Sequence, residues 1–144
     1  MSMEETLRLH SEFRAHVHLV LRSIVQAITG LEPGPRRLLM AIEAYWEACY
    51  GRRDERTSMM AAARRTHSEA ALTRQTQIFT NMLASELHHC GVAQPAPFAQ
   101  SLAQEVRAIA RAELMAGHRL PWQRQRLLSH LENHLSCGDA ASAA

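Results

Sequence analysis

The sequence has 144 residues, which is enough for one domain of ordinary size. Hydrophobic residues make up 47% and charged residues 21%, a composition typical of globular rather than disordered chains. The net charge of +2 is too small to indicate a nucleic-acid-binding surface. All basic side chains are arginine, so each cation is a planar fork rather than a flexible point charge.

The ends of the chain and its cysteines indicate a cytoplasmic protein. No apolar run approaches the roughly 18–20 residues that a membrane span needs, and the acidic start has no apolar signal segment. Cys49, Cys90 and Cys137 lie far apart and form no C-x-x-C pair. An odd number at these spacings argues against a disulfide framework and for a reducing compartment. We expect Cys49 to be a small buried hydrophobe.

Apolar residues follow helical spacing along the chain. The first stripe, at intervals of three and four residues, predicts a helix over about residues 4–29 that stops at Gly30. Pro35 suits the first turn of a second helix, which ends at Gly51. A third, shorter helix follows around Met59.

Three more helices are predicted in the second half. Thr66–Glu69 has the pattern of a capping box, which opens a fourth helix that stops at Gly91. A fifth helix begins after two prolines and stops at Gly117, and a leucine-rich sixth begins at Pro121. The small and polar residues 138–144 predict a disordered tail.

These elements predict the fold class. No stretch alternates with period two, so we expect no sheet, and no fixed-period repeat indicates a solenoid. The predicted fold is all-α, a bundle of about six helices joined by short links. We expect residues 1–137 to form a single domain, in which residues 1–30 hold the long N-terminal helix.

Nine histidines raise the question of a metal site. His130 and His134 lie four residues apart on one helical face, which is a spacing able to chelate an ion. Glu86 and His89 give one Glu-x-x-His motif, whereas a di-iron bundle needs two. The chain also lacks a glycine-rich phosphate loop and a nucleophile elbow. We therefore expect structural histidines, no metal or cofactor, and no enzymatic activity.

Arginines cluster in four segments, namely Arg36–Arg37, Arg52–Arg53 with Arg56, Arg64–Arg65, and Arg119 with Arg124 and Arg126. Acidic residues are interspersed among them, which favours solvated helix faces with ion pairs inside helices. The alternative is an anion-binding rim, and the scatter over four segments weakens it.

Five segments, in chain order, follow one known succession of helices: Leu38–Cys49, Asp54–Met60, Gln77–Gly91, Pro97–Ala103 and Gly117–Pro121. The first is similar to a central helix, and the second to the short helix that follows it. The third is similar to a long helix closing with Leu-x-x-x-Gly. The fourth is similar to the start of the next long helix, and the fifth leads into a last leucine-rich helix. Over residues 35–136 the chain thus resembles the ligand-binding and dimerisation domain of the tetracycline-repressor (TetR) family of bacterial regulators.

The resemblance implies a regulatory function, and one departure from it limits that function. The family carries an N-terminal three-helix DNA-binding head, and nothing before the first long helix has the pattern of that head. The resemblance therefore implies a headless regulatory domain with no direct DNA binding. Its output would pass through a partner protein, including a heterodimer with a full-length regulator.

The resemblance also implies a pocket for a small apolar molecule between the second, third, fourth and fifth helices. The candidate ligand-binding residues are Tyr45, Trp46, Cys49, Met60, Phe79 and Met82, with His67 as a polar contact. In the family, two long helices pair with their symmetry mates, which implies a homodimer. The residues expected in that interface are Phe79, Leu83, Leu87, Leu102, Val106, Ile109 and Leu114.

Other interpretations stay open. The apolar stripes of the long helices are also compatible with burial inside one chain. A helical interaction protein with a dry core and no small ligand is the main alternative function, and a metal-binding helical bundle is the third.

Overall fold

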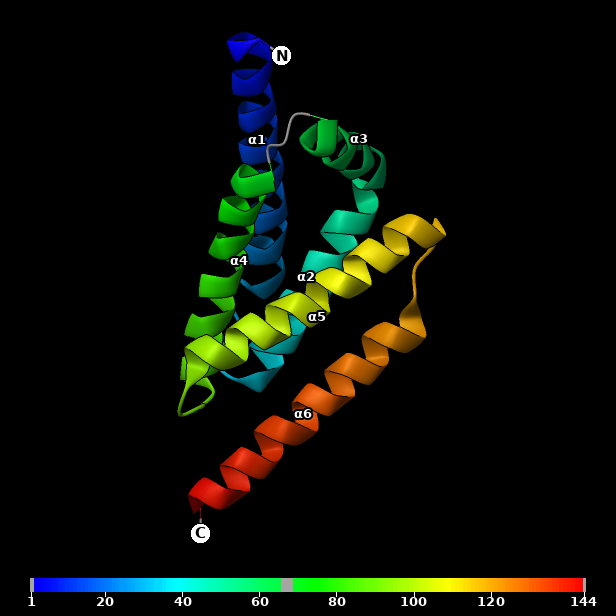
Figure 1. Ribbon diagram of the computed structural model, residues 1–144. Helices are drawn as coiled ribbons and strands as arrows, with labels where there is room; N and C mark the ends of the chain where they lie inside the picture. The colour runs from blue at the N-terminus through cyan, green and yellow to red at the C-terminus, as the bar shows by residue number, and fades with distance from the viewer. Residues whose placement is uncertain (1, 66–68, 144) are drawn as a thin grey trace.

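The structure is a computed structural model that describes residues 2–65 and 69–143, with side chains described over residues 2–65 and 76–136. All regular structure in the described residues is α-helical, which confirms the predicted all-α bundle of about six helices (Figure 1). The helices are α1 (Met3–Ile28), α2 (Pro35–Gly51), α3 (Arg53–Arg65), α4 (Glu69–His89), α5 (Pro95–Ala116) and α6 (Pro121–Ala143). In the described part of the chain, no helix combines the length and apolarity needed to cross a membrane.

The helix ends follow from local sequence. The Ser2 hydroxyl caps α1 by accepting a hydrogen bond from the Glu5 backbone N–H at 3.1 Å. Prolines open α2, α5 and α6, where their missing N–H would have had no partner within the helix. Glycines with φ of 87°, 83° and 75° follow α1, α4 and α5, because this left-handed conformation strains residues with a Cβ.

The predicted C-terminal tail and the predicted capping box have different outcomes. Helix α6 continues to Ala143, through the segment for which the sequence analysis expected a disordered tail. Alanine is the strongest helix former, and the end of the chain is rich in it, which favours continuation of the helix. The proposed capping box over residues 66–69 lies largely outside the described residues.

Helix α2 is the centre of the bundle and packs against all five other helices. Figure 1 shows α1 beside α4 and shows α5 crossing the bundle obliquely. Trp46 of α2 has no exposed surface, and its indole Nε1 donates a hydrogen bond to the Val106 carbonyl of α5 at 2.9 Å. This bond satisfies the polar atom of a large buried ring and fixes α2 against α5.

Ion pairs, of which the Arg124–Glu113 pair is buried, join α5, α6 and the segment between them to α2. Arg124 donates to both carboxylate oxygens of Glu113, at 2.6 and 2.7 Å, and also pairs with Glu47 of α2. Arg119 donates to the same Glu47 at 3.0 Å. Glu113 is 1% exposed, so its charge depends on this bidentate partner. The network orients α6 along the bundle.

The apolar core is divided into two clusters. The main cluster surrounds α2 and draws on every described helix except α3. A smaller cluster joins the first half of α1 to α3 and consists of Leu9, Phe13, Met59 and Ala63. The space between the two clusters is where the candidate site lies.

Candidate ligand-binding pocket

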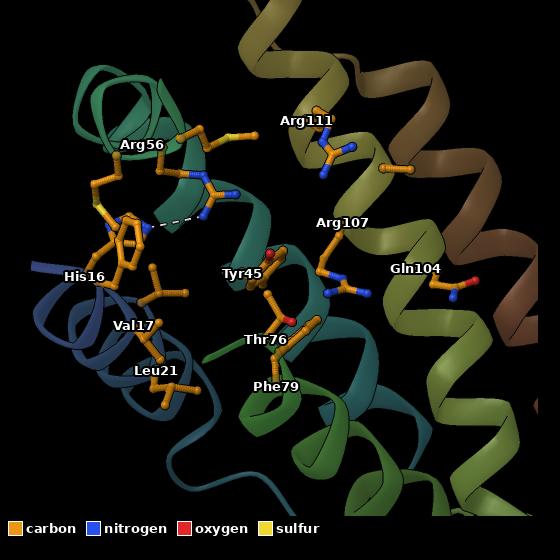
Figure 2. Close-up of a pocket in the computed structure, with 15 residues that line it drawn as sticks. His16, Val17, Leu21, Tyr45, Arg56, Thr76, Phe79, Gln104, Arg107 and Arg111 are labelled. Atoms are coloured by element: carbon orange, nitrogen blue, oxygen red, sulfur yellow. Dashed lines mark hydrogen bonds between the residues drawn. The ribbon is translucent and has the colours of Figure 1, made fainter. Parts of the chain in front are cut away.

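A pocket of about 370 Å³ lies between the two core clusters and is lined by residues of α1 to α5 (Figure 2). Its volume is near the lower end of the range of small-molecule sites, which run from about 300 to 1,000 Å³. Much of its wall is apolar, and the aliphatic and phenyl side chains in it are Phe13, Val17, Val20, Leu21, Met59, Met60 and Phe79. Such a wall suits the apolar part of a small ligand.

Three of the residues proposed from the sequence line this pocket: Tyr45, Met60 and Phe79. The rings of Tyr45 and Phe79 stack with centroids 4.2 Å apart and planes 13° apart. Burial raises the pKa of the Tyr45 phenol well above its ordinary value, so the ring stays neutral. The stacked pair forms a rigid aromatic floor contributed by α2 and α4.

The other proposed residues do not line the pocket. Trp46 follows Tyr45 and therefore points about 100° away from it around α2, into the main core. Cys49 is buried in the same core, as expected for a small hydrophobe, and burial raises the pKa of its thiol. Met82 is half-buried against the main cluster, and His67 lies outside the described residues.

Three arginines also line the pocket. Figure 2 shows Arg107 and Arg111 of α5 and Arg56 of α3 extending into the space between these helices. Arg107 and Arg111 are four residues apart, so successive turns of α5 place them on one face. Neither residue was predicted as a site residue. Their i, i+4 spacing, on a helix already expected to border a pocket, could have indicated a basic face on the pocket wall.

No ion pair with a described carboxylate neutralises these three guanidinium groups. Arg107 donates to the backbone carbonyl of Ala103 at 3.3 Å, and Arg56 approaches the ring of His16. Elsewhere several arginines pair between helices rather than within one helix, as Arg37 of α2 does with Glu86 of α4 at 2.9 Å. Among the described lining residues none is acidic, so the pocket has an excess of positive charge.

His16 of α1 contributes a buried polar group to the wall. Arg56 Nη1 lies 3.2 Å from His16 Nε2, and a guanidinium can only donate, so Nε2 accepts and Nδ1 carries the hydrogen. Nδ1 has no hydrogen-bond partner among the described residues, since the nearest carboxylate oxygen, of Glu55, is 3.9 Å away. Burial, and then the charge of Arg56, lower the pKa of His16 to about 4, while Glu55 opposes the shift. The ring is therefore neutral near pH 7.

The contribution of α1 was missed by the sequence analysis, which placed the pocket between the second and fifth helices. Val17, Val20 and Leu21 of α1 line it, together with Phe13 and His16. Their spacing is the same as that of an ordinary core stripe, so periodicity alone does not distinguish a pocket wall from a filled core.

Two residues of the motifs that raised the question of a metal site make other contacts. The His134 ring packs against Phe98 with centroids 4.9 Å apart, and Glu86 of the Glu-x-x-His motif is engaged by Arg37. Within the described part of the chain, no group of three histidine, cysteine or carboxylate side chains is arranged to hold a metal ion.

The residues proposed for a dimer interface lie mostly inside the single chain. Ile109 and Leu114 are half-buried, and five others are buried: Phe79, Leu83, Leu87, Leu102 and Val106. Leu83, Leu87 and Val106 have no exposed surface, and Phe79 and Leu102 are 5% exposed, so these five pack mainly within the chain. Their burial agrees with the alternative that the apolar stripes of the long helices are buried inside one chain.

Comparison with protein-family models, curated proteins and solved structures finds no match for this chain.

Proposed function

We propose that the protein is a small-molecule-binding domain whose ligand occupies the pocket between α1 and α5. The observation that carries the proposal is a 370 Å³ pocket with a largely apolar wall, situated between two core clusters that do not join. Transfer of apolar ligand surface from water to such a wall is favourable by roughly 25 cal/mol per Å².

Ligand binding in this position has a structural consequence. The pocket borders Met59 of the small cluster and Phe79 of the main cluster. A ligand touching both would join the α1–α3 unit to the rest of the core, and binding only the folded form raises stability by mass action. The arrangement of α3 is then sensitive to the ligand, as a regulatory domain requires.

The resemblance to TetR-type ligand-binding domains supports the regulatory part of the proposal. On this account the chain senses a small molecule and a partner protein reads the resulting change. A domain that only binds proteins would not need a pocket of this size, and the pocket favours the sensing function over that alternative.

The test uses 1-octanol as an apolar probe, observed by saturation-transfer NMR. Ala108 is an exposed residue of α5 that borders the pocket, so Ala108→Trp should fill the pocket without disturbing the core. Ala96→Trp is the matched control, because Ala96 is exposed on the same helix and does not border the pocket.

We expect saturation transfer to octanol from the wild type and from Ala96→Trp, and at least a severalfold loss for Ala108→Trp. Absence of transfer from the wild type, or equal transfer from all three proteins, would overturn the proposal.

A further inference from the structure

We infer that the ligand is a small amphipathic organic acid, whose carboxylate lies among Arg56, Arg107 and Arg111 and whose apolar body lies against α1. The inference rests on the proposed function, because it names the chemical class that the same pocket takes. The apolar wall alone does not indicate whether the ligand is charged, and the inference concerns that charge.

The polar and apolar parts of the pocket lie on different sides. Figure 2 shows Arg107 and Arg111 on α5, across the pocket from Val17 and Leu21 on α1. Arg56 reaches toward the same space from α3. A ligand with one charged end and one apolar end matches this division, whereas a uniformly apolar ligand would leave the guanidinium groups facing hydrocarbon.

The sign of the charge follows from the three uncompensated cations. Arg56 and Arg107 are both half-buried, so solvent screens their charges less than those of exposed arginines. The planar fork of a guanidinium matches the two oxygens of a carboxylate, which accepts hydrogen bonds without donating any. A ligand cation would be repelled by all three groups.

His16 also lines the pocket and is 3% exposed. Its Nε2 lies 3.2 Å from Arg56 Nη1, and its Nδ1 lies 3.9 Å from a carboxylate oxygen of Glu55, which does not line the pocket. The ring therefore adds no negative charge that would offset the three arginines.

The experiment compares three probes of equal chain length, octanoate, 1-octanol and octylammonium, by isothermal titration calorimetry near pH 7. We expect octanoate to bind at least about tenfold more tightly than 1-octanol, since hydrogen bonds to charged groups are roughly twice as strong as neutral ones. Octylammonium should bind more weakly than 1-octanol. The preference for octanoate should fall as salt concentration rises.

The double variant Arg107→Gln/Arg111→Gln should lower the affinity for octanoate to near that for 1-octanol and leave the affinity for 1-octanol unchanged. The control is Arg14→Gln/Arg126→Gln, which removes the same charge from two exposed arginines outside the pocket. This control should keep the preference for octanoate.

The outcomes separate the two proposals. Equal affinities for the three probes in the wild type would overturn the inference and leave the proposed function standing. Loss of the octanoate preference in the control variant would also overturn the inference, because net charge rather than the pocket arginines would then explain it. Failure of all three probes to bind would overturn both.

Discussion

His16 shows how one residue combines structural and functional constraints. The ring is buried between α1 and α3, next to Arg56, and its neighbours keep it neutral. A neutral histidine accepts from the arginine and leaves its other nitrogen without a partner. The residue therefore lowers the stability of the protein under acidic conditions.

The shifted pKa predicts a specific pH dependence. The pKa of His16 is about 4 in the folded protein and 6.5 in the unfolded chain, so the unfolded chain binds the proton first as pH falls. The free energy of unfolding should fall as pH drops below about 6.5 and level off near pH 4, by on the order of 3 kcal/mol from this residue. Urea unfolding at pH 7 and at pH 4.5 measures the effect.

His16→Gln removes the titrating imidazole and keeps an acceptor for Arg56. The carboxylates and the other histidines still titrate in this variant, so it measures their share of the pH dependence. We expect a smaller loss of stability at pH 4.5 in this variant than in the wild type. An equal loss in the two proteins would show that His16 does not contribute.

The candidate site was predicted from the sequence only in part, for reasons visible at individual residues. Tyr45 and Phe79 are aromatic residues on helices with a clear core stripe, and such residues often border pockets as well as cores. Trp46 is also an aromatic residue on α2, but its side chain lies in the main core, because one residue along a helix is about 100° of rotation. Arg107 and Arg111 have i, i+4 spacing on a helix expected to border the pocket, but the same spacing is typical of a solvated helix face.

At the scale of elements, the helix boundaries were largely predictable because they are fixed by local chemistry. A glycine after one helix and a proline at the start of the next mark three links: α1 to α2, α4 to α5, and α5 to α6. The end of α6 was not predicted, since a run of small residues is compatible with either a helix or a tail. Pairing between helices depends on contacts far apart in the sequence, which local patterns do not contain.

Two glycines test the boundary argument directly. Gly117 has φ of 75°, whereas Gly51 is the last residue of α2 and helical, and a Cβ at either position would meet no atom within 4 Å. Gly117→Ala should therefore lower the free energy of unfolding by about 1–2 kcal/mol through backbone strain alone. Gly51→Ala should raise it by up to about 1 kcal/mol, because alanine favours the helix.

Chemical denaturation of the two variants and the wild type measures both changes. Opposite signs support the assignment of Gly117 as the residue that ends α5. A destabilisation of equal size at both positions would contradict it.

At the scale of the whole molecule, the division of the core into two clusters is the property that makes a binding site. The long first half of α1 packs mainly on α3, while its second half belongs to the main core, so α1 spans the gap between them. Five of the seven residues expected in a dimer interface belong to the main cluster, namely Phe79, Leu83, Leu87, Leu102 and Val106. The molecule thus buries much of its long apolar stripes within one chain and leaves an apolar wall at the pocket between the clusters.

The measurement that tests the central claim most directly is the location of the bound probe. Titration of isotope-labelled protein with octanoate, followed by amide chemical shifts, reports where the acid binds. We predict that the largest shifts lie at the pocket wall, at Val17, Met60 and Ala108. Shifts centred instead on the groove between α5 and α6, near Phe98 and His130, would contradict the claim that the pocket between the two core clusters is the ligand site.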